Sequence, residues 1–313
     1  MPTVQDIRIV KALKKISVGY SNGNYIAEKV LPKVDVTGST GTYYKWGRES
    51  FSLENDKRAP GREANRISQS VSHNDQYLLL EHSLSTDIPK EDIREGDIQG
   101  LKIKTKKTKT LKDKLLLRQE YTVAQKLFNV SSFPGMTSAL GATAKWDVVA
   151  TSTPLEDVEK ARQAILKQTG ILPNIMVIGG EVWSKLKRHP SLLNAVNGGA
   201  TTSNIAMISL EVAASLFELE EIIVGNTVVN AGAEGEAFSG GFVWGKYALI
   251  AYRAKQPDVD SPSLGYILSD PAMEDVKTGK DERAKSEWVD VSTYYTVEIT
   301  SAISGYLYSA VVS

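Results

Sequence analysis

The chain has 313 residues, 42% of them hydrophobic and 24% charged, and its 37 basic and 37 acidic side chains give a formal net charge of zero. This length corresponds to about two domains, and the hydrophobic content excludes wholesale disorder. A neutral surface favours association, while the lack of a basic excess argues against a general nucleic-acid-binding protein. Cysteine is absent, which excludes disulfides, thiolate nucleophiles and cysteine metal sites. We expect a soluble intracellular product without signal peptide or membrane span.

The first 80 residues are expected to form an arm followed by a projecting loop. Residues 1–35 have too little apolar content to fold alone, so they are either a frayed terminus or an arm that docks on a neighbour. Strand-like stretches at residues 42–46 and 67–80 flank a highly charged segment with a Pro60-Gly61 turn. An isolated hairpin is marginally stable in water. A two-stranded arm would therefore lie against another surface, and a disordered loop is the alternative.

Two strong helices are predicted in the middle of the chain. Residues 111–129 carry an apolar stripe that includes Leu111, Leu115 and Leu127. Helix-start signals at residues 87–92 would extend this helix to about 40 residues, roughly 60 Å, although Gly96 and Gly100 weaken the stretch between. The second helix has Thr153 as its cap, Pro154 at its first position and Gly170 at its end.

Short apolar strands alternate with helices from residue 145 to residue 255. Strands are predicted at residues 173–179, 221–225 and 242–252, and helical segments at residues 181–187 and 210–216. This alternation is typical of one compact α/β unit. The remaining strand-like segments, residues 265–268, 287–300 and 304–312, are expected to pack against the long helix, because neither buries itself alone.

The sequence contains no recognisable catalytic or metal-binding pattern. His73, His82 and His189 lack the spacing of a metal site, and His73 beside Asp75 is interpreted as an exposed surface pair. Residues 240–246 match GxxxxGK, but a tyrosine follows the lysine and the stretch reads as a strand. The densest cationic run is a solvated helix face, or a contact with an acidic neighbour or with DNA; it consists of Lys102, Lys104, Lys106, Lys107 and Lys109.

Several local patterns follow one another in a definite order along nearly the whole chain. They are residues 25–32 (YIAEKVLP), 43–46 (YYKW), 58–61 (RAPG), 115–120 (LLLRQE), 127–129 (LFN), 146–147 (WD), 169–174 (TGILPN), 182–183 (VW), 223–225 (IVG) and 243–245 (VWG). In this order and spacing the sequence resembles the major capsid proteins of tailed bacteriophages. These proteins share their shell fold with encapsulins and the herpesvirus capsid floor.

The resemblance implies an α+β shell fold with four parts. Residues 1–40 would be the N-terminal arm, and residues 41–80 the extended β-hairpin loop. Residues 81–144 and 256–313 would form a peripheral domain with a long spine helix and the C-terminal strands. Residues 145–255 would be the α/β axial domain, which gathers around fivefold and sixfold centres.

The implied function is self-assembly through hexamers and pentamers into an icosahedral phage head that encloses DNA. The protein would be assembled in the host cytoplasm and reside in the virion, without catalysis, cofactor, metal or membrane contact. Implied partners are other copies, a separate scaffolding protein, a portal, in some cases a decoration protein, and DNA contacted non-specifically. The alternatives are an encapsulin-like bacterial compartment, a monomeric binding module and an unrecognised α+β enzyme. The expected subunit contacts are Trp46, Arg48, Glu49, Lys57, Arg58, Pro60, Gly61, Arg62, Glu63, Asn197, Gly198 and Gly199.

Overall fold

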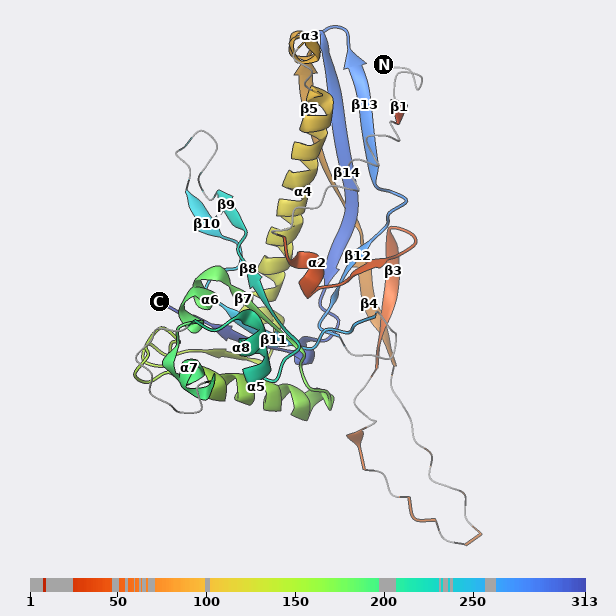
Figure 1. Cartoon of the computed structure of the whole chain (residues 1–313). Helices are drawn as coiled ribbons and strands as arrows, with labels where there is room; N and C mark the ends of the chain where they lie inside the picture. Colours follow the sequence, from red (N-terminus) through yellow and green to blue (C-terminus); the bar gives the residue numbers. More distant parts are fainter. Residues whose placement is uncertain are drawn as a thin grey trace.

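The structure is a computed structural model of the chain. It describes residues 8–9, 25–46, 51–53, 56–58, 60, 61, 63, 66, 71–98, 102–196, 207–230, 232, 236, 239–256 and 263–313. Within these residues the fold is α+β, as predicted, and it consists of a six-stranded unit, a five-stranded unit and two projecting hairpins (Figure 1).

The six-stranded unit is an elongated sheet covered on one face by a long helix. Its strands are β1 (Arg8–Ile9), β2 (Lys33–Asp35), β5 (Leu80–Pro89), β12 (Tyr266–Ser269), β13 (Asp275–Asp281) and β14 (Ser286–Glu298). They lie in the order β1-β13-β14-β12-β2, and β5 pairs antiparallel with the other edge of β14. Alternate side chains such as Val289 and Val291 contact Leu111 and Leu115 of the helix in a small core. Because buried apolar side chains recur at alternate positions of β14, this alternation determines which face of the sheet the helix covers.

The predicted 40-residue helix is wrong as a single element. The structure has α3 (Lys90–Ile98) and α4 (Ile103–Leu127), and Lys102 between them has non-helical backbone angles (φ −82°, ψ 74°). Glycine at positions 96 and 100 costs about 1 kcal/mol each in a helix interior, which favours a break here. In Figure 1 α3 lies across the end of α4 rather than continuing it.

The five-stranded unit is an α/β body built largely from residues 145–255, with strands from residues 137–139 and 305–309 added to its sheet. Its sheet has the order β6-β15-β11-β7-β8, and its helices surround that sheet. The strands are β6 (Thr137–Ala139), β7 (Ile175–Gly179), β8 (Glu221–Gly225), β11 (Ala248–Ala251) and β15 (Gly305–Ser309); the helices are α5 (Pro154–Thr169), α6 (Gly180–Leu186), α7 (Pro190–Val196) and α8 (Leu210–Leu216), with short 3₁₀ turns at Val130–Ser132 and Ala302–Ser304. β7 is buried along its whole length, as a central strand of continuous apolar residues should be.

Three details of this unit differ from expectation. Residues 242–252 form two strands in different sheets, β10 and β11, because a turn at residues 243–246 carries Trp244 into the core. Thr153 precedes α5, but its side chain makes no capping hydrogen bond; Gly170 does end the helix in the left-handed conformation (φ +69°). β15 pairs with β11 and β6, so residues 305–309 lie in the five-stranded unit and not with the strands of residues 256–298.

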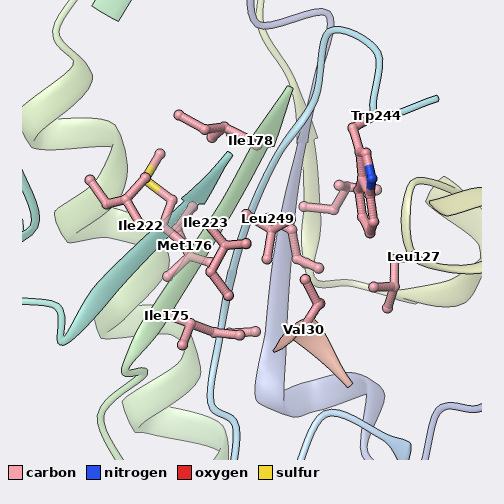
Figure 2. Packing of buried hydrophobic residues seen from close by; sticks show 14 of the residues in the cluster. Val30, Leu127, Ile175, Met176, Ile178, Ile222, Ile223, Trp244 and Leu249 are labelled. Carbon is pink, nitrogen blue, oxygen red and sulfur yellow. The ribbon is translucent and has the colours of Figure 1, made fainter. Parts of the chain in front are cut away.

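The described part of the N-terminal segment packs into the body of its own chain. α2 (Ala27–Val30) and the following Leu31 are buried, and Val30 and Leu31 are 0% exposed. Figure 2 shows Val30 facing Leu127 of α4 and Leu249 of β11, in one cluster that also includes Trp244. Residues 26–31 are therefore packed into their own chain rather than frayed, and one core spans both units.

Two hairpins project from this body (Figure 1). The long one begins with β3 (Thr40–Trp46) and β4 (Val71–Leu78), which pair antiparallel from Thr40–Leu78 to Trp46–Val71, with an irregularity between Tyr43 and Lys45. The short one consists of β9 (Val228–Asn230) and β10 (Gly240–Phe242), which pair antiparallel from Val228–Phe242 to Asn230–Gly240. Within the arm predicted for residues 41–80, β3 and β4 thus form a paired base.

Candidate assembly surfaces

A fully buried carboxylate joins the three main parts of the chain. Glu120 of α4 is 0% exposed. Its two oxygens accept hydrogen bonds from the backbone N–H of Ile26 (3.1 and 3.0 Å), the backbone N–H of Ala27 (2.7 Å), the hydroxyl of Thr227 (3.1 Å) and the indole N–H of Trp244. A buried charge is costly unless its acceptor positions are filled. Here they are filled by the N-terminal segment and the five-stranded unit.

The Glu120 junction places both projecting hairpins relative to the long helix. Ile26 and Ala27 lie on the N-terminal segment that leads into β3, while Thr227 precedes β9 and Trp244 follows β10. The first turn of α2 has no side-chain cap of its own, so Glu120 satisfies N–H groups that a helix start leaves unpaired. Three of the local sequence patterns described above contribute residues around this one carboxylate. They are residues 25–32, 115–120 and 243–245.

The long hairpin carries most of the predicted contact residues. Trp46 lies in β3 opposite Val71, and Lys57, Arg58, Pro60, Gly61 and Glu63 are exposed beyond it; Arg48, Glu49 and Arg62 lie outside the described residues. Gly61 has φ +78°, which fits the predicted turn. Glu63 and Arg66 form an exposed ion pair (3.5 Å) within the hairpin. A pair of this kind contributes little to stability, so these charges are available to direct association.

Two apolar residues of the same hairpin were missed by the sequence reasoning. Phe51 is 61% exposed and Leu53 is fully exposed, although the surrounding segment is polar. The Phe51 ring lies beside Gly170, where a Cβ would stand 3.1 Å from it, and the neighbouring Leu172 is also exposed. Large apolar side chains at the surface of a projecting segment mark a contact surface. The sequence did contain a signal for this surface, because the two apolar residues stand within an otherwise charged stretch.

A second apolar surface flanks the expected subunit contacts at residues 197–199. Asn197, Gly198 and Gly199 lie outside the described residues. On either side of them, Val196 at the end of α7 and Met207, Leu210 and Val212 at the start of α8 are 37–54% exposed. These four side chains were also missed, because residues 210–216 were predicted only as a helical segment, with no exposed face assigned to it.

The short hairpin presents a third apolar surface. Val228 and Phe242 are directly paired across β9 and β10, and they are 45% and 46% exposed. An antiparallel ribbon of this size does not bury such a pair by itself. Together, the long hairpin, the α7–α8 edge and the short hairpin give three apolar surfaces at separate places on one subunit.

The buried histidine of the five-stranded unit is held by hydrogen bonds. His189 is 2% exposed and is held by Ser152 (Nε2 to Oγ, 2.9 Å) and by Ser191 (Nδ1 to Oγ, 2.6 Å; backbone N to Nδ1, 3.2 Å). Burial lowers the pKa of this imidazole, so it is a neutral, hydrogen-bonded core residue. The described part of the chain contains no group of three His, Cys, Asp or Glu that could hold a metal ion. None of its helices is long and apolar enough to cross a membrane.

Comparison with known proteins agrees with this arrangement. Residues 98–261, just over half of the chain, match the family described as phage major capsid protein E. The major capsid protein of Burkholderia phage BcepMu is 29% identical over 318 residues, covering 99% of each chain. The crystal structure of a phage-related protein from Bordetella bronchiseptica RB50 covers 97% of each chain with a TM-score of 0.75 and 27% identity.

The fold also extends to more distant shells. The SrpI encapsulin of Synechococcus elongatus PCC 7942 covers 90% of this chain, and 86% of its own chain is matched, with a TM-score of 0.55 and 14% identity. The fold is therefore that of shell-forming proteins common to phage capsids and encapsulins. The chain itself belongs to the phage major capsid protein E family, and its function is to form the capsid shell.

Proposed function

We propose that this capsid protein assembles through hexamers and pentamers into a closed icosahedral head that encloses phage DNA, and that it acts without catalysis. The observation that carries the proposal is the set of three separate apolar surfaces on one subunit. Contacts between unlike surfaces are heterologous, and heterologous contacts close into rings when the rotation between subunits allows it. Rings of five and six that use the same surfaces build a closed shell.

The long hairpin is the proposed contact between ring neighbours. Phe51 and Leu53 would supply apolar anchors, and the charged residues beyond them would fix register and orientation more than affinity. The predicted contacts are Trp46, Arg48, Glu49, Lys57, Arg58, Pro60, Gly61, Arg62 and Glu63 on this hairpin. Asn197, Gly198 and Gly199, between the exposed ends of α7 and α8, would contribute to contacts near the ring centre.

A separate scaffolding protein and a portal are proposed partners, with a decoration protein in some shells, and assembly would take place in the host cytoplasm. The second candidate function is an encapsulin-like compartment, which the fold similarity supports. Identity favours the phage shell, because the BcepMu capsid protein is 29% identical and the SrpI encapsulin only 14%. A portal and terminase gene beside this one, rather than a cargo enzyme gene, would distinguish the two.

Electron microscopy and size-exclusion chromatography of the purified protein test the proposal, with scaffolding protein added if needed. We expect closed shells, rings or tubes from the wild type. Replacing residues 48–64 with a short Gly-Ser linker should leave monomers or small rings while the subunit keeps its melting temperature. A wild type that remains monomeric at high concentration, with or without scaffold, would overturn the shell proposal. Normal closed particles from the linker variant would overturn the hairpin's role.

A pair of double variants separates apolar anchoring from charge within the hairpin. Phe51→Ser with Leu53→Ser removes the exposed apolar side chains, and Lys57→Gln with Arg58→Gln removes two exposed charges. We expect the first to abolish shell formation and the second to slow it mainly at low salt, since exposed charges act through screened long-range attraction. Equal effects from both variants would contradict apolar anchoring.

A further inference from the structure

The exposed face of α4 is a dense lysine surface. Residues 102–114 contain seven lysines and one acidic residue, Asp113. Lys102, Lys106, Lys107, Lys109 and Lys114 are exposed, and we call these five the lysine face. Two other lysines of α4 point to the sheet instead. Lys104 forms an ion pair with Glu287, and Lys126 forms one with Glu298 (3.1 Å). Because the apolar side of α4 is held against the sheet, the lysine face is fixed on the opposite side.

The far face of the same sheet carries the opposite charge. Val289 and Val291 point to α4, so by alternation Asp290 points away from the helix, together with its cross-strand partners Ser85 and Lys277. The acidic residues in these outward register positions are Glu81, Asp87, Asp275, Asp281 and Asp290. The six-stranded unit therefore has a basic helix side and a predominantly acidic sheet side, although the whole chain has no net charge.

The composition of the lysine face fits a polyanion better than a protein surface. Contact regions between proteins have an apolar centre and are depleted in lysine. α4 is described from end to end, and it exposes none of the chain's large apolar side chains, in contrast to the two hairpins and the α7–α8 edge. Lysine is a flexible point charge that contacts phosphate without reading sequence. Duplex DNA presents about one negative charge per 1.7 Å of its axis.

We infer that the lysine face contacts the phosphate backbone of packaged duplex DNA and forms part of the inner surface of the shell, with the acidic side of the sheet turned away from the DNA. This inference rests on the proposed function, since it requires a shell that encloses DNA. α4 is about 37 Å long at 1.5 Å per residue, and the lysine face lies at its half nearer α3. One subunit would therefore neutralise a few phosphates only. Many copies would line the interior with weak, non-specific contacts.

Binding of a fluorescent 30-base-pair duplex to unassembled subunits or capsomers tests the inference. We expect affinity that is independent of base sequence and falls steeply with salt. The triple variant Lys106→Gln, Lys107→Gln, Lys114→Gln should reduce the slope of log affinity against log salt by about 2 to 3, since each lost phosphate contact contributes about 0.9. The matched control is Lys277→Gln, Arg283→Gln, Lys285→Gln, three exposed basic residues on β13 and in the turn that follows it. The control should keep the wild-type slope.

Lysine acetylation read by mass spectrometry gives a second test that needs no variant. Bound duplex should protect Lys106, Lys107 and Lys114 of the wild type and leave Lys277 reactive. Unchanged DNA affinity in the triple variant, or equal protection at Lys277, would overturn the inference. If the triple variant kept its DNA affinity but no longer formed shells, the lysine face would contact an acidic surface of a neighbouring copy instead. In all of these outcomes wild-type shells still form, so failure here is distinguishable from failure of the proposed function.

Discussion

Trp244 donates its indole N–H to the carboxylate of Glu120, a residue 124 positions earlier in the chain. Both side chains are 0% exposed, so the bond lies in the interior, where an unsatisfied partner on either side is costly. Trp244 also packs edge-on against Phe128 at the end of α4 (ring centroids 5.3 Å apart). The five-stranded unit is thus attached to the long helix by this hydrogen bond and that of the Thr227 hydroxyl, both beside an apolar contact.

Glu120→Gln should destabilise the subunit by about 2–4 kcal/mol. The amide keeps the volume of the carboxylate but directs N–H groups at the N–H donors of Ile26, Ala27 or Trp244. Urea unfolding followed by tryptophan fluorescence on unassembled subunits measures the loss. The control is Gln125→Ala, an exposed position on the same helix, which should change the free energy of unfolding by less than about 0.5 kcal/mol. Equal midpoints for Glu120→Gln and wild type would contradict the role of the junction.

Gly179→Ala should destabilise the subunit by about 2–3 kcal/mol, the usual cost of overpacking a rigid core. A Cβ at Gly179 would lie 1.9 Å from the carbonyl oxygen of Gly245 and 2.3 Å from that of Trp244. Both are backbone atoms, so β7 or the turn after β10 would have to move. Gly141→Ala meets open space and should be neutral. Thermal unfolding of the two variants, side by side, checks the difference.

Acidification should weaken the five-stranded unit through His189. Its folded-state pKa is lowered by burial, so the neutral form is favoured on folding. The resulting stability is fully present above the unfolded-state pKa of about 6.5 and is lost as pH falls through the lower folded-state pKa. The free energy of unfolding of His189→Gln should therefore vary less between pH 7.5 and pH 5 than that of the wild type.

His82→Gln is the comparison for this pH effect. The pKa of His82 is likewise lowered, by burial and by the nearby Arg118. His82, however, lies in the six-stranded unit, where it stacks on Tyr295 (ring centroids 4.2 Å apart). Hydrogen exchange at pH 5 should show loosening of α6 and α7 in His82→Gln but not in His189→Gln. Loosening of α6 and α7 to the same extent in both would show that His189 is not the responsible group.

Phe242→Ser should impair assembly without harming the subunit. Because Phe242 is already 46% exposed, the free energy of unfolding of the subunit should change little. If the short hairpin is a contact surface, burying the remaining apolar area would contribute on the order of 1.4 kcal/mol per contact, equivalent to about a tenfold change in association constant. Light scattering should then show about a tenfold higher protein concentration at the onset of assembly. An unchanged onset would remove the short hairpin from the proposed contacts.

Elements specified by local signals could be predicted from the sequence. α5, between Pro154 and Gly170, and the continuous apolar strand β7 were both found as expected. Elements that depend on distant partners could not. β5 is a ten-residue strand because β14 lies beside it, about 200 residues later in the chain, whereas its own sequence ends in a helix-start signal. The turn after β10 likewise depends on the buried site that receives Trp244.

The candidate surfaces divide in the same way. Charge and turn signals in residues 48–63 identified the long hairpin, because those signals are local. The exposure of Phe51, Leu53 and Phe242 could not be foreseen, since an apolar residue in a sequence is expected inside. In the sequence nothing distinguishes Glu120 from the other acidic residues. Its role depends on donors at positions 26, 27, 227 and 244, which only the fold brings together around it.

The position of β15 has a consequence for synthesis. β15 lies between β6 and β11, yet it follows every other strand of that sheet in the chain. A ribosome that stops before residue 305 releases a product whose sheet lacks an interior member, with β6 left unpaired and β11 exposing one edge. Such a product cannot complete the body that carries the α7–α8 edge and the short hairpin. We therefore expect prematurely terminated copies to be excluded from the particle, because the last strand is needed to complete the sheet.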